Sequence, residues 1–360
     1  MSGVVMITTG GTGGHIFPGL AVATELIARG WRVFWLGTRD GMEARIVPGH
    51  KVEFEAIDFG SVRGKGWVRF LLGPFAIMSA CWQALQVIRR RRPDVVVGFG
   101  GFVSFPGGLM AVARGVPLVI HNLDAKPGLA NRILRFAADR TLTGFPNTFS
   151  AGTDRKVTWV GNPLRADIIA IAPPEERFIG RSGALNLLVV GGSLGAVALN
   201  ANVPLALSLL ASGERPRVIH QAGEKHLEAL REGYRAVGVD ADCVAFIHDM
   251  AKCYAEADVI VCRSGATTVA EVSAVGLGSV LVPFPHAADD HQVDNARILA
   301  DCDAAEMILQ NELTPDRLAA WLRAVTRERL LTMAMAARKL RKADATQRVA
   351  DTCIAVAQMR

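Results

Sequence analysis

Short apolar runs alternate with longer Ala/Leu-rich segments of helical spacing along the whole chain. The short runs are rich in Val, Ile and Leu, which is typical of parallel strands that are buried on both faces. They predict strands at residues 4–8, 32–36, 52–57, 94–98, 117–121, 140–143, 185–190, 218–220, 244–247, 259–262, 280–282 and 305–309. Helices are predicted between the strands and, at the end of the chain, over 314–326, 327–341 and 345–358. This order indicates an α/β protein built on doubly wound parallel sheets.

The alternation of strand and helix breaks once, between Gly161-Asn162-Pro163 and Pro173-Pro174. A chain of 360 residues is too long for one ordinary domain and is comfortable for two. We therefore expect domains at residues 1–162 and 163–342. The last segment, 343–360, is expected to be a helix that packs back on the first domain.

A glycine-rich stretch, Thr8–Pro18, joins the first predicted strand to a predicted helix over 19–29. Its glycines leave backbone N–H groups uncovered at the carboxyl edge of a sheet, where open α/β sheets bind ligands and a helix N-terminus favours anions. His15 stands at the mouth of this loop; the alternative is a tight turn that only needs glycine. The stretch is not a dinucleotide fingerprint, because the third glycine of that motif would fall on Ile16 and no acidic residue follows the second strand.

The second half of the chain repeats this plan with a glycine turn over 191–196. Further on, a strand ends at Cys262 and hydroxyl groups with backbone N–H groups open the next helix, which indicates an anion site. One turn into that helix Glu271 is placed to hold two vicinal ribose hydroxyls, although a lone helix carboxylate is usually solvated. The next loop, 283–296, carries Asp, His, Gln and Asn side chains that can read sugar hydroxyls. Without the neighbouring anion site, the Asp289-Asp290 pair of this loop would be interpreted only as helix N-caps.

The composition limits the chemical classes of partner that the chain is expected to bind. The net charge of +6 favours an anionic partner: nucleic acid, acidic lipid or a phosphorylated small molecule. Aromatic residues, at 6%, are too few for a nucleic-acid platform. Six scattered cysteines without a C-x-x-C pair indicate reduced core residues of a cytoplasmic protein, and no signal peptide is expected before the first strand.

Residues 70–88 carry no formal charge, and this uncharged segment is about as long as a helix that spans a bilayer. Gly73-Pro74 interrupts the segment and polar side chains lie within it, so a transmembrane helix is disfavoured. Pro74 suits the first position of a helix, and Arg89–Arg92 suit its negative C-terminal end. Two interpretations stay open: a buried domain helix with a basic cap, or an interfacial helix whose apolar side lies in an anionic membrane surface.

Seven distinctive stretches follow one another along essentially the whole chain. They are Gly10-Gly-Thr-Gly-Gly-His-Ile-Phe-Pro-Gly-Leu-Ala, Arg63-Gly-Lys, Gly100-Gly-Phe-Val-Ser-Phe-Pro-Gly-Gly, Gly161-Asn-Pro-Leu-Arg, Gly191-Gly-Ser, Cys262-Arg-Ser-Gly-Ala and His291-Gln-x-x-Asn-Ala. In this order they resemble the MurG family of peptidoglycan N-acetylglucosaminyltransferases. That family adds GlcNAc from UDP-GlcNAc to undecaprenyl-pyrophosphoryl-MurNAc-pentapeptide, which converts lipid I to lipid II.

The resemblance implies a GT-B fold: two Rossmann-like doubly wound parallel-sheet domains that face each other across a cleft. The N-terminal domain would bind the acceptor and the membrane, and the C-terminal domain the donor UDP-GlcNAc. An inverting transfer without metal or cofactor is implied, at the cytoplasmic face of the bacterial inner membrane, by a peripheral protein with no nucleic-acid partner.

Site residues carry over onto matching positions of this chain. The implied substrate contacts are Thr12, Gly13, Gly14, Asp124, Arg165, Ser193, Ile247, Ala266, Thr267, Thr268, Val269, Ala270, Glu271 and Gln292. Ile247 would meet the uracil, Glu271 the ribose and Gln292 the GlcNAc hydroxyls. His15 is the implied base on the acceptor hydroxyl, with Asp124 as its rival.

Two stretches depart from the family pattern, at three positions. Where the family usually reads His-Glu-x-Asn, this chain has His121-Asn122-Leu123-Asp124, and Leu194 replaces a usual glutamine. A carboxylate therefore stands at Asp124 where an amide is expected near the donor. Both departures put local contacts in question and leave the expected fold and reaction unchanged.

Alternative functions remain at this point. A metal-dependent transferase would want an Asp-x-Asp pair at a strand end, but Asp240-x-Asp242 and Asp301-x-Asp303 lie beside no glycine loop and are expected to be solvated turns. A UDP-GlcNAc epimerase-like enzyme of the same plan would not need the apolar and basic segment at 63–92. A membrane scaffold that only binds nucleotide would release no UDP.

Overall fold

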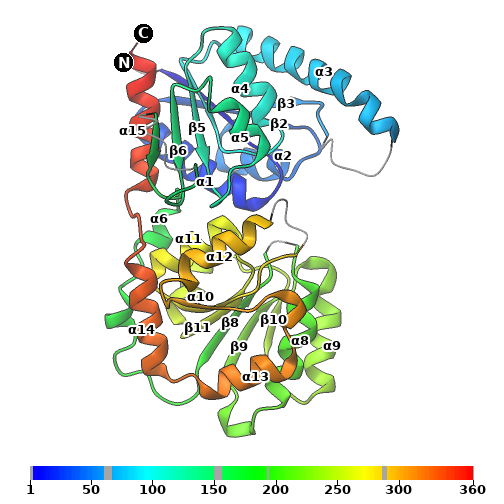
Figure 1. Ribbon diagram of the computed structural model, residues 1–360, viewed down its shortest axis with the longest axis vertical. Helices are drawn as coiled ribbons and strands as arrows, with labels where there is room; N and C mark the ends of the chain where they lie inside the picture. Colours follow the sequence, from blue (N-terminus) through cyan, green and yellow to red (C-terminus); the bar gives the residue numbers. More distant parts are fainter. Residues whose placement is uncertain (1–2, 61–66, 150–155, 193, 286–289, 360) are drawn as a thin grey trace. The chain divides into compact units, whose positions relative to one another are not determined.

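The computed structural model describes residues 3–60, 67–149, 156–192, 194–285 and 290–359, with the backbone alone over 67–72. The chain forms two compact units. Unit 1 comprises Met1–Arg165 and Lys342–Arg360, and unit 2 comprises Ala166–Arg341. The chain therefore leaves unit 1 once and returns to it at the end (Figure 1).

Unit 1 is built on a seven-stranded parallel sheet in the order β3-β2-β1-β4-β5-β6-β7. Its strands are β1 (Val4–Thr8), β2 (Arg32–Thr38), β3 (Glu53–Ile57), β4 (Val95–Gly98), β5 (Leu118–Asn122), β6 (Arg140–Thr143) and β7 (Val157–Trp159). The helical segments are α1 (Gly13–Ala28), α2 (Met42–Ile46), η1 (Val47–His50), α3 (Trp67–Arg91), α4 (Ser104–Ala113), α5 (Leu129–Leu134) and α15 (Ala345–Gln358).

Helices cover both faces of this sheet. On one face α3, α4 and α5 share a core with the strands, to which they contribute Ala84, Ala111 and Leu134. On the other face α15 packs along α1 and touches β4 and β5. Arg29, directly after α1, also pairs with Asp351 of α15. Burial on both faces explains the near-continuous apolar sequence of the central strands.

Unit 2 repeats the design with a six-stranded parallel sheet in the order β10-β9-β8-β11-β12-β13. Its strands are β8 (Asn186–Val190), β9 (Arg217–Gln221), β10 (Asp242–Val244), β11 (Val259–Cys262), β12 (Gly278–Leu281) and β13 (Ala305–Met307). The helical segments are α6 (Ala166–Ile169), α7 (Pro174–Arg177), α8 (Val197–Ser208), η2 (Ser212–Glu214), η3 (Glu224–His226), α9 (Leu227–Ala236), α10 (Met250–Glu256), α11 (Ala266–Val275), α12 (His291–Ala300), η5 (Gln310–Glu312), α13 (Pro315–Ala324) and α14 (Arg327–Arg338).

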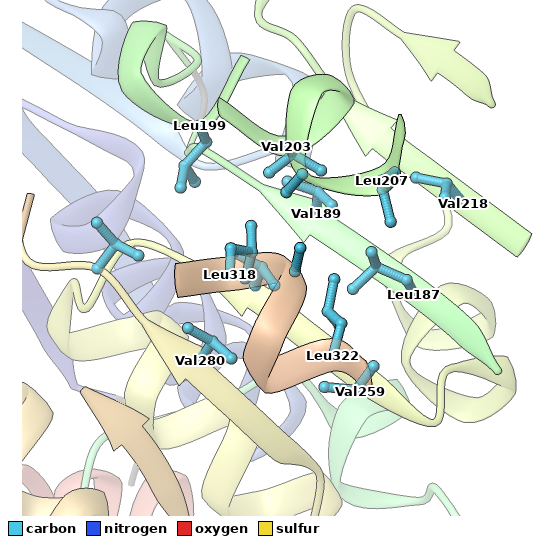
Figure 2. Packing of buried hydrophobic residues seen from close by; sticks show 14 of the residues in the cluster. Leu187, Val189, Leu199, Val203, Leu207, Val218, Val259, Val280, Leu318 and Leu322 are labelled. Carbon is cyan, nitrogen blue, oxygen red and sulfur yellow. The ribbon is translucent and has the colours of Figure 1, made fainter. Parts of the chain in front are cut away.

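The core of unit 2 joins alternate residues of its strands to two helices. Leu187 and Val189 of β8 lie in one cluster with Val203 of α8 and Leu318 of α13 (Figure 2). These side chains are all at most 2% exposed. Burying a side chain of this size contributes about 1.5–3 kcal/mol relative to leaving it exposed. The packed sheet thus supplies a rigid base for the loops at its edges.

The expected α/β architecture and its doubly wound parallel sheets are confirmed, and the structure corrects four local predictions. Strand β7 was not predicted, and the strand expected at 244–247 ends at Val244. Helix α1 begins at Gly13 rather than Gly19, because the N–H groups of His15 and Ile16 both donate to the carbonyl of Thr12. Pro74 lies inside α3 instead of starting it, at an exposed position where water can bond the carbonyl that loses its helical donor.

A buried histidine ties α8, α9 and β9 together. The Nδ1 atom of His220 lies 3.0 Å from the hydroxyl of Tyr234, and its Nε2 lies 3.1 Å from the amide oxygen of Asn200. Since that oxygen only accepts, Nε2 carries the proton and Nδ1 accepts from the tyrosine. Burial lowers the pKa of His220 to about 3, so the imidazole is neutral in the folded protein.

This neutral histidine should make stability depend on pH. Below pH 6.5 the unfolded chain binds a proton at His220 that the folded chain does not, so the free energy of unfolding falls as the pH drops. Between pH 6.5 and 5 the loss should be about 2 kcal/mol from this residue. Urea unfolding of His220→Gln across this range should show that much less pH dependence than the native chain. An unchanged pH dependence would contradict the assignment.

Candidate active site

Each sheet reverses its winding direction between two central strands. In unit 1 the reversal lies between β1 and β4, and in unit 2 it lies between β8 and β11. Open parallel sheets bind ligands at this point, outside the carboxyl ends of the strands. The glycine-rich loops singled out in the sequence follow these strands, so each unit presents a candidate site at its reversal point.

The first glycine loop is shaped by its own backbone. Gly11 has φ +114°, a conformation that residues with a Cβ rarely adopt. Thr12 is extended and precedes the first turn of α1, which therefore consists of Gly13, Gly14 and His15. The predicted contacts Thr12, Gly13 and Gly14 thus stand at a helix N-terminus, where backbone N–H groups and the helix dipole favour an anion.

A buried carboxylate holds this loop in place. Glu43 of α2 is fully buried, and one of its oxygens accepts from the N–H of Gly11 at 3.2 Å. The other accepts from the N–H and the hydroxyl of Thr38, at 2.9 and 2.7 Å. A Cβ on Gly10 would lie 2.4 Å from this carboxylate, so the close approach requires glycine. Glu43 therefore fixes the loop after β1 to the end of β2.

The loop after β4 packs directly on the first glycine loop. A Cβ on Gly101, which has φ +77°, would lie 2.3 Å from the carbonyl oxygen of Gly10. The hydroxyl of Thr9 donates to the carbonyl of Gly100 at 3.0 Å. Backbone therefore meets backbone at the reversal point, which explains why the sequence needs glycine in both loops.

The contact between these loops also orients His15. Its Nδ1 lies 3.0 Å from the carbonyl oxygen of Phe99. Because a carbonyl only accepts, Nδ1 carries the proton of the neutral ring and Nε2 has the lone pair. His15 is thus arranged as a proton acceptor through Nε2.

The end of β5 forms the third part of this edge. The side-chain amide of Asn131 donates to Asn122 Oδ1 at 2.9 Å, and Asn122 donates to the carbonyl of Asp124 at 2.7 Å. His121 is fully buried, which lowers its pKa to about 4, and its Nε2 donates to the carbonyl of Gly161. The departure at 121–124 is therefore accommodated by internal hydrogen bonds, with Asp124 half-buried beside the edge.

In unit 2, one glutamine connects two loops. Gln221, 2% exposed at the end of β9, donates through Nε2 to the carbonyl of Gly192 at 2.8 Å. Its Oε1 accepts from the N–H of Ile247 at 2.9 Å. The glycine turn after β8 and the loop after β10 are thus held at a fixed separation, and Ile247 stands in that second loop.

The N-terminus of α11 is joined to α12. The hydroxyl of Ser264 donates to the carbonyl of Gln292 at 2.7 Å, and Asn295 donates to the carbonyl of Ser264 at 3.1 Å. The side-chain oxygen of Gln292 accepts from the N–H of Phe284 at 2.9 Å. This fixes the orientation of the amide, whose NH₂ group is left to donate to a ligand oxygen.

Glu271 lies on α11 within the same unit. The hydroxyl of Tyr254 donates to its Oε2 at 2.9 Å. The neighbouring Cys262 is fully buried, and burial and the charge of Glu271 raise the pKa of its thiol, so Cys262 is a neutral core residue.

Some of the predicted contacts on α11 have side chains that are buried in the core and are therefore not exposed to a ligand. Val269 is fully buried in the core and its N–H already donates to the carbonyl of Gly265. Ala266 is also buried, while the hydroxyl-bearing residues Thr267 and Thr268 and the methyl of Ala270 are partly exposed.

Two further predicted contacts lie outside this group. Arg165, at the end of unit 1, stacks 5.9 Å from the centre of the Phe17 ring. Ser193 lies outside the described residues.

Sequence reasoning missed the residues that hold the site. Glu43, Gln221, Tyr254 and Asn131 are not among the predicted contacts. Gln221 and Tyr254 each hydrogen-bond a predicted contact, Ile247 and Glu271, while Glu43 and Asn131 bond Gly11 and Asn122, which lie within two residues of one. Gln221 alone carried a signal, since it directly follows the strand predicted at 218–220, at the ligand edge. The others are single polar residues on helices, which sequence patterns do not separate from solvated ones.

The two acidic pairs named in the sequence lie at the surface of unit 2. Asp240, Asp301 and Asp303 are exposed outside helices and strands, as the solvated-turn interpretation predicted, whereas the exposed Asp242 is the first residue of β10 rather than part of a turn. Within the described ranges, no three His, Cys, Asp or Glu side chains are grouped as metal ligands.

Helix α3 combines features of both interpretations left open by the sequence. Ala80, Ala84 and Ile88 on one side are at most 2% exposed and belong to the core. Phe75 and Trp82 on the other side are 64% and 59% exposed. Across the stretches that the structure describes, no helix combines the length and apolar character needed to cross a bilayer.

The basic end of α3 is only partly available. Arg90 and Arg91 pair with Glu55 at 2.5 and 2.6 Å, while Arg89 and Arg92 are exposed. Two of the four arginines therefore stabilise β3 instead of forming a free cationic flank.

The chain is similar to known glycosyltransferases over its whole length. The Glycosyltransferase family 28 N-terminal domain matches residues 5–143 and the Glycosyltransferase family 28 C-terminal domain matches residues 186–349. The UDP-N-acetylglucosamine--N-acetylmuramyl-(pentapeptide) pyrophosphoryl-undecaprenol N-acetylglucosamine transferase of Dechloromonas aromatica is 53% identical over 358 residues, which is 99% of this chain and 100% of that protein.

Solved structures separate the transferase from the epimerase alternative. MurG of Acinetobacter baumannii superposes with a TM-score of 0.83 at 39% identity, over 98% of this chain and 99% of that one. A Listeria monocytogenes protein assigned as a UDP-N-acetylglucosamine 2-epimerase reaches a TM-score of 0.65 at 14% identity, over 97% and 95% of the two chains, which shows a shared fold alone. The two doubly wound units, the ordered glycine loops and the full-length identity agree, and the chain belongs to the MurG family of glycosyltransferases.

Proposed function

We propose that this chain transfers GlcNAc from UDP-GlcNAc to undecaprenyl-pyrophosphoryl-MurNAc-pentapeptide, with inversion and without a metal ion. The observation that carries the proposal is the pair of reversal points, each with a glycine loop that leads to a helix, in a chain 53% identical to such a transferase. Incubation with labelled UDP-GlcNAc and a short-chain lipid I analogue tests it. The expected product is the lipid-linked disaccharide, and its absence under conditions where a known MurG is active would refute the proposal.

Unit 2 is proposed to bind the donor. The N-terminus of α11 offers Ala266, Thr267 and Thr268 to the diphosphate, since backbone N–H groups and hydroxyls can stabilise the charge that develops when UDP leaves. Glu271 is proposed to accept from two ribose hydroxyls. Gln292, whose amide orientation is fixed by Phe284, is proposed to donate to a GlcNAc hydroxyl.

Unit 1 is proposed to bind the acceptor and to supply the base. The acceptor hydroxyl oxygen attacks the anomeric carbon, the bond to UDP breaks, and the hydroxyl proton passes to Nε2 of His15. The carbonyl of Phe99 supports this role because it keeps the proton of the neutral ring on Nδ1. Thr12, Gly13, Gly14 and Arg165 are the proposed contacts of this unit with the donor.

The layer formed by α3, α4 and α5 is proposed to contact the cytoplasmic membrane surface. The undecaprenyl chain of the acceptor stays in the bilayer, so a peripheral enzyme must reach it there. Large apolar side chains of this layer are exposed, and they are Phe75, Met78, Trp82, Leu109, Leu129, Ile133 and Phe136. Exposed Arg89 and Arg132 accompany them, and Arg135 stacks 4.7 Å from the ring of Phe136. Apolar burial combined with basic charge is the pattern of an interfacial surface on anionic lipids.

Removing the proposed donor contacts should weaken catalysis in a defined way. Glu271→Ala and Gln292→Ala should each lose about 1–3 kcal/mol of transition-state stabilisation, because each removes a hydrogen bond to the sugar nucleotide. Steady-state kinetics with UDP-GlcNAc and its galacto epimer should show weaker discrimination in Gln292→Ala. Glu256→Ala, which removes an exposed carboxylate of the same unit, is the control. Unchanged kinetics in both site variants would refute the contacts.

Two variants decide whether His15 or Asp124 is the catalytic base. His15→Ala should lower turnover by about 100-fold or more, because no base then takes the proton from the hydroxyl of the acceptor substrate. Asp124→Asn should have a milder effect. Single-turnover rates with saturating donor measure this step. A larger loss in Asp124→Asn than in His15→Ala would transfer the role to Asp124.

The membrane contact can be tested on residues whose exposure is known. Phe75→Glu with Trp82→Glu should abolish vesicle binding and activity on full-length lipid I, while activity on a short water-soluble acceptor stays near the native value. Ile179→Glu with Leu209→Glu, at exposed apolar positions of unit 2, is the matched control. Native binding should weaken with added salt and without anionic lipid. Equal vesicle binding by both double variants would contradict the proposal.

A further inference from the structure

Tyr254 reaches the proposed ribose-binding carboxylate from a second helix. It lies on α10, is 1% exposed, and donates its hydroxyl proton to Glu271 Oε2 at 2.9 Å. A hydrogen bond to a carboxylate is charge-assisted and therefore stronger than one between neutral groups. One oxygen of the carboxylate is thus oriented by the protein before any ligand arrives.

The helix that carries Tyr254 is itself tied to the helix that carries Glu271. The guanidinium of Arg177 donates to the carbonyl of Tyr254 at 3.4 Å and to the carbonyl of Val275, in the last turn of α11, at 3.1 Å. At the other end of α10, the side chain of Asp249 accepts from the N–H of Lys252 at 3.0 Å. The position of the phenol is therefore set by backbone contacts as well as by its own hydroxyl.

We propose that Tyr254 is a positioning residue for the ribose: it holds the Glu271 carboxylate in the orientation that accepts two vicinal hydroxyls. A glutamate side chain loses rotamer freedom when it is ordered, and a carboxylate that is already oriented loses less of it on binding. The inference rests on the proposed function, in which Glu271 contacts the donor ribose. Tyr254 touches no substrate in this scheme and acts through Glu271.

The chain offers a matched control, because it has two tyrosines and both are buried in unit 2. Tyr254→Phe removes the hydroxyl that meets Glu271, and Tyr234→Phe removes the hydroxyl that meets His220. Calorimetry should measure the dissociation constants of UDP and of 2′-deoxy-UDP for the native chain, both variants, Glu271→Ala and the double variant Tyr254→Phe/Glu271→Ala. Thermal unfolding of each variant reports on folding.

In Tyr254→Phe, UDP should bind about tenfold more weakly, with a smaller loss for 2′-deoxy-UDP, which offers the carboxylate only one hydroxyl. In the Glu271→Ala background the same change should cause no further loss. Tyr234→Phe should bind UDP within about twofold of the native chain, even where its melting temperature falls. A second variant, Glu271→Asp, draws the carboxylate away from Tyr254 and should lose the preference for UDP over 2′-deoxy-UDP as well.

Three results would overturn the inference: native UDP affinity in Tyr254→Phe, an equal loss in Tyr234→Phe, or an undiminished loss in the Glu271→Ala background. In each case UDP still binds the native chain and the proposed function stands. If the native chain binds no UDP, the proposed function and this inference fall together.

Discussion

All strands within each sheet run parallel, and the rest of the structure depends on this constraint. Parallel strands need a crossover between successive members, so helices cover both faces and the strands become apolar throughout. Polar side chains are then displaced to the strand ends, where all carboxyl termini meet along one edge. In unit 1 this edge carries Thr9, His15 and Asn122, and in unit 2 it carries Gln221 and Ser264. The chemistry therefore follows from the topology.

Polar residues at these edges act mainly by holding one another. Glu43 binds a glycine loop, Gln221 binds two loops and Tyr254 binds a carboxylate, and all three are almost completely buried. A buried polar group that lacks a partner costs free energy, so each fixes its neighbour in one arrangement. Such an arrangement is what electrostatic stabilisation of a leaving diphosphate needs, because donors that are already oriented need no reorganisation during the reaction.

The sequence predicted the architecture because its signals are local and repeated. Val-rich strands such as 259–262 stand between helical segments, and glycine followed by an N-terminal turn marks the ligand edges. Two of the errors lie in one short strand and at the start of one helix. Strand β7 has little apolar signal, and α1 begins six residues early because the carbonyl of Thr12 accepts from the N–H groups of His15 and Ile16. Most of the site contacts came from family resemblance, and all of them remain predictions. The supporting residues Glu43 and Tyr254 could not be found from sequence, since only the fold brings them to their partners.

The division of unit 1 between the two ends of the chain has a consequence for synthesis. Unit 2 is one continuous segment, Ala166–Arg341, whereas unit 1 needs α15 from Ala345–Gln358 to cover α1 and the adjoining strands. On the ribosome, residues 1–165 therefore emerge first but lack one of their covering helices until the rest of the chain has been made. Unit 2 has all of its residues before unit 1 does. The order of completion is thus the reverse of the order of emergence, and the apolar surface beneath α15 is the one that a nascent chain must keep from aggregating.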